Sequence, residues 1–85
     1  MKMFILENCP HCKRACQWIS ELKEENPEYR GIEIELVDEA KNSDLANCYD
    51  YYYVPSIFDG EFKLHEGVAS KEILKSIFDN YLNKL

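Results

Sequence analysis

The 85-residue sequence lacks several features that would assign it to large functional classes. It has no run of basic residues and its formal net charge is −6, which makes nucleic acid an unfavourable partner. Its apolar runs are too short to span a membrane. No signal-peptide pattern precedes the strand-like run after Met1, so we expect a reducing, cytoplasmic location. The sequence also has no repeats, linkers or low-complexity segments, and its length predicts a single domain, residues 1–85, with a modest core.

The feature that stands out is the motif Cys9-Pro10-His11-Cys12, which lies between an apolar run and a helical pattern. In a reducing compartment, cysteines at this spacing indicate catalysis or metal binding rather than structural disulfides. Pro10 suits the first position of a helix, which predicts that Cys9 caps that helix and Cys12 lies in its first turn. Cys9 would then face the positive end of the helix dipole and unpaired backbone N–H groups.

This placement predicts two cysteines with different roles. An ordinary thiol with a pKa of about 8.5 is about 3% ionised at pH 7, whereas a thiol with a pKa of about 6 is about 90% ionised. We therefore predict that Cys9 is the reactive nucleophile and Cys12 the resolving cysteine. Cys16 and Cys48 are expected to be mainly packing residues.

Apolar periodicity predicts the element order β-α-β-α-β-β-α. In the strand at 32–36, Ile32, Ile34 and Leu36 alternate with glutamates, which is typical of an edge strand. The short helix after it should carry Leu45, Cys48, Tyr49 and Tyr52. The predicted segments are a buried strand at 2–6, a helix from Pro10 to about Asn26, the edge strand, a short helix capped by Ser43, a hairpin at 56–64 and a helix capped by Ser70.

The Cys-Pro-His-Cys motif after the first strand of a βαβ unit, followed by Val54-Pro55 before a hairpin, resembles the thioredoxin superfamily. The chain's size and opening look like those of a glutaredoxin. The resemblance implies an α/β, thioredoxin-like fold: a four-stranded mixed sheet in the order 2-1-3-4, with helices on both faces. It also implies a cis Pro55 beside the cysteine pair, and a substrate strand that pairs with the backbone of Val54. Tyr53 and Gly67 would flank that strand.

The activity that the resemblance implies is thiol–disulfide exchange on protein disulfides or glutathione mixed disulfides, without a tightly bound cofactor. The electron donor would be glutathione, as a co-substrate, or a thioredoxin-reductase-type flavoprotein. Two positions that normally help to hold glutathione in glutaredoxins differ here. Glu7 lies in the segment where a lysine is usual, and Gly67 is a single glycine where two are usual. The sequence therefore leaves the electron donor open.

His11 and Lys13 are predicted to support Cys9. An imidazole or its cation next to Cys9 would favour the thiolate, and Lys13 would add a smaller effect of the same sign. Stabilising the thiolate stabilises the reduced form, which predicts a reduction potential near about −200 mV or above, compared with about −270 mV for thioredoxin. The alternative, that His11 is an exposed residue without a role, stays open.

Two other functions also stay open at this point. A metal- or iron–sulfur-carrying protein would use Cys9, His11, Cys12 and Cys16, but no second Cys-x-x-Cys completes the four ligands that zinc requires, so we expect no metal site. The other alternative is a redox-silent peptide-binding module that keeps the fold.

Overall fold

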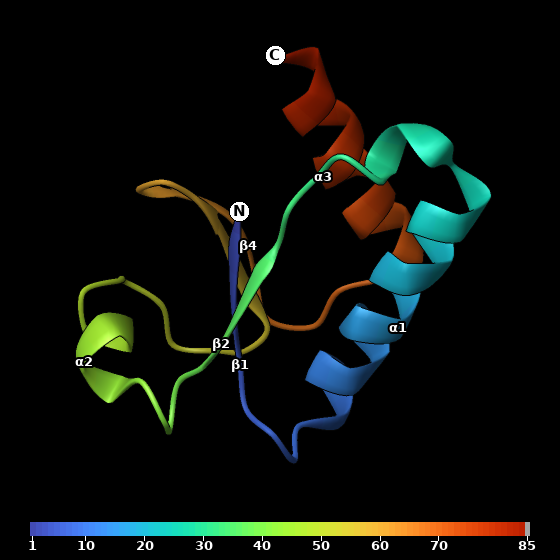
Figure 1. Cartoon of the computed structure of the whole chain (residues 1–85). Coiled ribbons are helices and arrows are strands. Elements are labelled where there is room, and N and C mark those ends of the chain that lie inside the picture. Colours follow the sequence, from blue (N-terminus) through green and yellow to red (C-terminus); the bar gives the residue numbers. More distant parts are fainter. Residues whose placement is uncertain (85) are drawn as a thin grey trace.

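A mixed sheet of four strands forms the centre of the molecule (Figure 1). The structure is a computed structural model that describes residues 1–84. The strand order β2-β1-β3-β4 confirms the predicted topology; β1 is parallel to β2 and antiparallel to β3, and β3 is antiparallel to β4. The elements are β1 (Lys2–Ile5), α1 (Pro10–Glu25), a 3-10 turn η1 (Pro27–Tyr29), β2 (Glu35–Asp38), α2 (Ser43–Ala46), β3 (Ser56–Asp59), β4 (Phe62–Glu66) and α3 (Lys71–Asn83).

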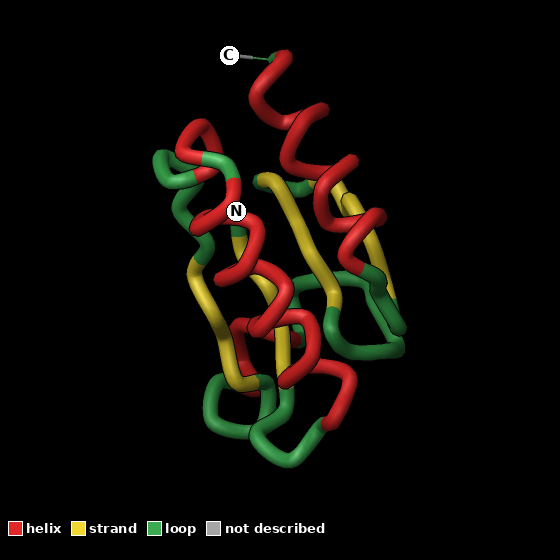
Figure 2. Tube along the Cα trace, turned by 90° about the vertical axis from the view of Figure 1, so that its right-hand side faces the viewer, coloured by secondary structure: helices red, strands yellow, loops and turns green. Residues whose placement is uncertain are grey.

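Helices α1 and α3 cover one face of the sheet (Figure 2) and enclose the larger core. The buried face of α1 is the predicted one, and α1 ends at Glu25 because Pro27 disfavours helical geometry in the residue before it. The side chains buried in this core include Met3, Ala15, Ile19, Leu22, Tyr29, Ile32, Ile57, Leu74 and Phe78. The core therefore joins the helix that begins at the cysteine motif to both central strands.

The opposite face of the sheet carries a smaller, aromatic core around Phe4. The ring of Phe4 lies 4.8 Å from that of Tyr49, 5.0 Å from that of Tyr51 and 5.8 Å from that of Phe58, measured between centroids. Tyr51 also donates a hydrogen bond to Glu39 at 2.5 Å. Rings from the segment after α2 therefore close this face, where α2 itself is too short to cover it.

The second strand begins three residues later than predicted. Residues 32–36 were expected to form it, but the ladder with β1 starts at the pair Lys2 and Glu35. Residues before Glu35 extend past the start of β1, where Met1 bonds the carbonyl of Glu33 but no strand pairing continues. Ile32 still enters the larger core, whereas Leu36 is 50% exposed and Val37 is buried on the other face. The predicted edge position of this strand is confirmed.

The short helix α2 also differs from the prediction. Asn42, rather than Ser43, occupies the N-cap position, and the helix ends after Ala46. Cys48 and Tyr52 therefore lie beyond it, and both side chains are exposed. The prediction that Cys48 is a packing residue is wrong, because a four-residue helix does not carry its apolar face that far along the chain.

The C-terminal half follows the sequence prediction closely. Gly60, with a φ of +61°, forms the turn of the β3–β4 hairpin. Ser70 caps α3 by accepting a hydrogen bond from the N–H of Ile73 at 3.1 Å. Lys71 then pairs with Glu21 at 3.1 Å and Glu25 at 2.7 Å. These ion pairs tie the start of α3 to the last turns of α1.

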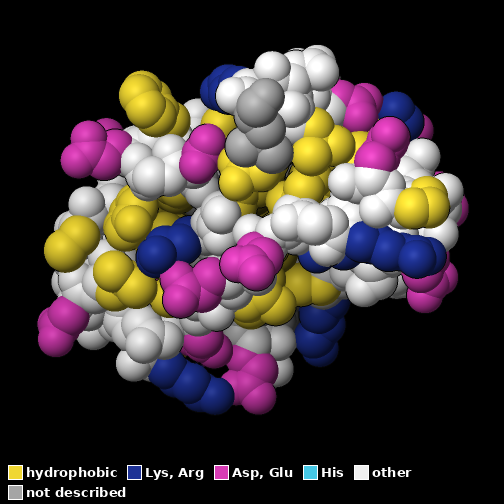
Figure 3. All heavy atoms as spheres, turned by 45° about the horizontal axis from the view of Figure 1, so that its top comes forward, with side chains coloured by type: hydrophobic (Ala, Val, Ile, Leu, Met, Phe, Trp, Pro, Cys, Tyr) yellow, Lys and Arg dark blue, Asp and Glu magenta, His cyan; other side chains and the backbone are white. Residues whose placement is uncertain are grey.

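The surface of the end that carries both termini is chemically mixed (Figure 3). Basic side chains lie among acidic and hydrophobic ones on the face drawn, rather than in a patch of their own. Within residues 1–84, the helices are all too short or too polar to cross a membrane.

Candidate active site

The cysteine motif forms the first turn of α1, as the sequence predicts. Cys9 is the N-cap residue with extended backbone angles, φ −86° and ψ 115°, and Pro10 is the first helical residue. The backbone N–H of Cys12 donates to Cys9 Sγ at 3.3 Å. The backbone N–H of Cys9 donates to the carbonyl of Leu6 at 3.2 Å. The sulfur of Cys9 therefore takes the place that a serine or aspartate oxygen takes at an ordinary helix N-cap.

The surroundings of Cys9 favour its thiolate. Partial burial acts to raise its pKa, but hydrogen bonds outweigh it: one from the Cys12 side chain, and others from the backbone N–H groups of Cys12 and His11. The net result is a pKa of Cys9 below its ordinary value. Each of these donors stabilises the charged form of the sulfur.

Cys12 is the opposite of Cys9 in exposure and in acidity. Its side chain is 2% exposed, and burial, together with its hydrogen bond to Cys9, raises the pKa of Cys12 to about 12. Cys12 therefore keeps its proton at neutral pH and donates it toward Cys9. All four cysteines are free thiols in this structure, so the pair is in its reduced form.

The three predicted supporting residues lie at the exposed start of α1. Pro10, His11 and Lys13 all have exposed side chains. The contact that His11 makes to Cys9 comes from its backbone N–H rather than from its imidazole. The backbone N–H of Lys13 bonds the carbonyl of Cys9 at 3.1 Å, which is the first regular hydrogen bond of α1.

The second part of the site is the segment before β3. The Val54–Pro55 peptide bond is cis, which confirms the prediction from the resemblance. Ser56, the next residue, pairs with Phe4 in the antiparallel β1–β3 ladder. Because β1 leads directly into the cysteine motif, the cis proline and Cys9 lie at the same end of the sheet. Val54 is half-buried there, and Tyr53 is 70% exposed.

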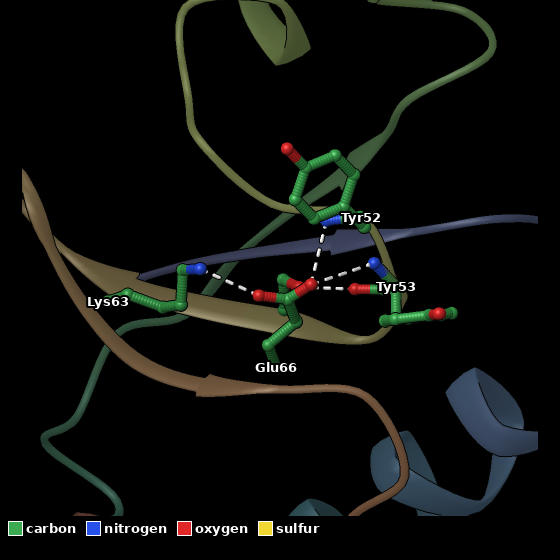
Figure 4. Close-up of polar contacts among 5 residues, drawn as sticks. Tyr52, Tyr53, Lys63 and Glu66 are labelled. Carbon is green, nitrogen blue, oxygen red and sulfur yellow. Dashed lines mark hydrogen bonds and ion pairs between the residues drawn. The ribbon is translucent and has the colours of Figure 1, made fainter.

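The end of β4 fixes this proline-containing loop. Gly67, with a φ of +90°, donates its N–H to the carbonyl of Pro55 at 2.9 Å. Glu66 accepts hydrogen bonds from the N–H groups of Tyr52 at 2.7 Å and Tyr53 at 3.0 Å, and pairs with Lys63 at 2.6 Å (Figure 4). The sequence prediction named Gly67 but not Glu66. The only hint in the sequence was that Lys63 and Glu66 are three residues apart and of opposite charge.

Two hollows border the cysteines on the β2 side of the motif. The first, of about 420 Å³, reaches Cys9; the second, of about 450 Å³, reaches both Cys12 and Cys16. Glu7 and Lys41 line both hollows and face each other at 3.8 Å. The first hollow is lined by Leu6, Glu7, Asn8, Cys9, Asp38, Ala40 and Lys41. Both signs of charge are therefore present beside the sulfur of Cys9.

The remaining two cysteines differ from each other. Cys16 packs against the larger core, and burial raises the pKa of its thiol. Cys48 is exposed, and its thiol donates to the carbonyl of Asp44 at 3.4 Å. Within residues 1–84, no group of three or more His, Cys, Asp or Glu side chains is arranged to hold a metal ion.

Comparison with known proteins gives one match. The family model described as Glutaredoxin matches residues 1–63, a span that includes the cysteine motif, the cis proline and the β3–β4 hairpin turn. Searches of curated proteins and of solved structures found no significant match.

Proposed function

Because this chain belongs to the glutaredoxin family, we propose that it is a thiol–disulfide oxidoreductase that works through Cys9 and Cys12. The observation that carries the proposal is the contrast between the two sulfurs. Cys9 is accessible and has a lowered pKa, whereas Cys12 is buried and protonated. Dithiol exchange requires a nucleophilic thiolate and a second thiol that stays protonated until the mixed disulfide has formed.

The first step forms a mixed disulfide. The Cys9 thiolate attacks one sulfur of the substrate disulfide, the substrate S–S bond breaks, and the departing sulfur leaves as a thiolate that takes a proton. A bond now joins Cys9 to the other substrate sulfur. The Cys9 end of this bond stays at the N-terminus of α1, where the Cys12 N–H contact holds it.

The second step releases the substrate. Cys12 loses its proton and its thiolate attacks Cys9 Sγ, which breaks the mixed disulfide and expels the second substrate thiol. The products are a fully reduced substrate and a Cys9–Cys12 disulfide, so two electrons pass from the protein to the substrate. Once Cys9 is no longer a thiolate, it no longer opposes deprotonation of Cys12, because the charge of Cys9 is one cause of the raised Cys12 pKa.

The substrates we propose are disulfides in protein segments or glutathione mixed disulfides. An extended segment would pair with the backbone of Val54, beside the exposed ring of Tyr53. Two glutathione molecules, or a thioredoxin-reductase-type flavoprotein, would return the Cys9–Cys12 disulfide to the dithiol. No tightly bound cofactor takes part in these steps, and a reducing cytoplasm would keep the pair in its active form. We further propose a reduction potential near about −200 mV or above.

A coupled assay tests the proposal. A peptide disulfide is offered with glutathione and glutathione reductase, and in parallel with thioredoxin reductase, while NADPH consumption is followed. We expect turnover with one of the two donors, and thiol titration should find two fewer thiols after oxidation, with Cys16 and Cys48 unchanged. In a Cys12→Ser variant the mixed disulfide should accumulate. Absence of turnover with both donors, together with four titratable thiols after oxidation, would contradict the proposal.

A further inference from the structure

We infer that Glu66 is a positioning residue that fixes the loop before the cis proline and thereby sets how tightly an extended substrate binds. This inference rests on the proposed function, because it assigns the binding half of the same site. Glu66 lies at the end of β4, paired in register with Ser56, and its side chain reaches back over the start of β3 to the loop (Figure 4).

The two carboxylate oxygens of Glu66 bind different partners. Oε2 accepts hydrogen bonds from the backbone N–H groups of Tyr52 at 2.7 Å and Tyr53 at 3.0 Å. Oε1 forms an ion pair with the ammonium group of Lys63 at 2.6 Å. Hydrogen bonds to a charged acceptor are about twice as strong as neutral ones. The contacts from Lys63, Tyr52 and Tyr53 together lower the pKa of Glu66 to about 2, so the charged form is present throughout the neutral range.

Tyr51 packs against Phe4, but the two tyrosines that follow it are exposed, so the stretch just before Val54 needs this support. Residues 51–55 form no regular secondary structure, and Tyr52 and Tyr53 are 86% and 70% exposed. Neither ring therefore anchors its own backbone. The backbone of Tyr52 and Tyr53 is held instead by Glu66 and by the hydroxyl of Ser56, which donates to the carbonyl of Tyr53. Without Glu66, the N–H groups of Tyr52 and Tyr53 would form hydrogen bonds with water instead, and the loop would sample other conformations.

The consequence concerns binding rather than sulfur chemistry. Glu66 contacts the two residues immediately before Val54, the residue proposed to pair with a substrate strand. The groups that lower the pKa of Cys9 belong to α1 and are independent of this loop. Loosening the loop should therefore weaken binding of a peptide disulfide and leave Cys9 reactivity unchanged. It should also leave reduction of a small aromatic disulfide unchanged, because such a reagent does not need the strand pairing.

Three variants separate these effects. Glu66→Ala removes both the hydrogen bonds to the loop and the ion pair with Lys63. Glu66→Gln keeps a neutral acceptor for the N–H groups. Lys63→Met is the matched control that removes the ion pair only. We expect Glu66→Ala to raise KM for a peptide disulfide about tenfold, with kcat and the Cys9 alkylation rate within about twofold of the wild type. Glu66→Gln should lie between Glu66→Ala and the wild type, and Lys63→Met should raise KM less than threefold.

Hydrogen exchange at the Tyr52 and Tyr53 amides is the direct readout of the loop, and it needs no turnover. Exchange should be faster in Glu66→Ala than in Lys63→Met; if Glu66→Ala does not fold, Glu66→Gln compared with the wild type takes its place. Unchanged KM, unchanged amide exchange, or an equal loss of Cys9 alkylation would overturn the inference. If the wild type reduces no disulfide, the proposed function fails, whereas the amide exchange still decides whether Glu66 holds the loop.

Discussion

The two halves of the site are held in place by different means. The cysteine half is one helical turn, and the hydrogen bonds that favour the Cys9 thiolate come from the side chain of Cys12 and from backbone N–H groups, all within three residues of Cys9. The loop half is irregular and depends on a side chain from another strand, Glu66, and on Gly67 beside it. In the first half, the geometry that any helix N-terminus has favours the Cys9 thiolate. The second provides a shape that only tertiary contacts maintain, so the two halves should respond to different mutations.

The largest effect on disulfide turnover is expected when the Cys9 sulfur is removed from the cysteine half. Cys9→Ser should reduce disulfide turnover by at least about a thousandfold, because a serine hydroxyl is not ionised at neutral pH and does not form a mixed disulfide. The coupled NADPH assay measures this. Cys48→Ser is the matched control, since that thiol is exposed, lies outside the cysteine motif and donates to the carbonyl of Asp44. Equal loss in both variants would show that the effect does not come from Cys9 chemistry.

The next effect concerns the aromatic core beneath the loop half. Phe4→Ala should lower the free energy of unfolding by about 3–5 kcal/mol, because Phe4 is fully buried against Tyr49, Tyr51 and Phe58. Phe62→Ala, at a position that is 75% exposed, should change it by less than about 0.5 kcal/mol. Urea denaturation of both variants checks the pair. Similar losses would mean that burial of Phe4 in the aromatic core does not contribute as described.

A smaller effect is expected at the turn that supports the cis proline. Gly67→Ala should lower the free energy of unfolding by about 1–2 kcal/mol, because its φ of +90° disfavours a residue with a Cβ. Space is not the cause, since the nearest atom to the added Cβ, in Tyr53, lies at an ordinary van der Waals distance of 3.8 Å. Gly31→Ala is the control, with open space around the added Cβ and no positive φ. It should be neutral or slightly stabilising in thermal denaturation. A neutral Gly67→Ala would show that the backbone angle does not matter.

The smallest effect is the acid dependence of the loop half. The pKa of Glu66 is about 2 in the folded chain, compared with an ordinary value of 4.5, so the folded state binds fewer protons between these values. Its contribution to stability is therefore complete above about pH 4.5 and is lost as the pH falls toward 2. The stability difference between the wild type and Glu66→Gln should shrink over that range in denaturation at stepwise pH. A constant difference would mean that Glu66 is not held as a carboxylate.

The cysteine half was the predictable part of this site, because Cys9, Pro10 and Cys12 are neighbours in the chain and helix geometry determines the rest. The apolar period likewise indicated the buried face of α1 and the strand order followed from the resemblance. The predicted bounds of β2 were wrong because a strand begins where its partner begins, and β1 starts only at Lys2.

The loop half was less predictable. No local pattern states that Glu66 reaches the backbone of Tyr52 and Tyr53, because that contact depends on how β4 is paired in register with β3. The exposure of Cys48 was missed for a related reason: the length of α2 depends on where the aromatic segment turns to cover Phe4.

The most direct test of the central claim is the pH dependence of Cys9 alkylation, followed site by site with mass spectrometry in the reduced wild-type chain. The account predicts that Cys9 reacts with a midpoint below the value of about 8.5 of an ordinary thiol, while Cys12 stays unreactive across the same range. A Cys9 midpoint at or above about 8.5, or alkylation of Cys12 as fast as that of Cys9, would contradict it.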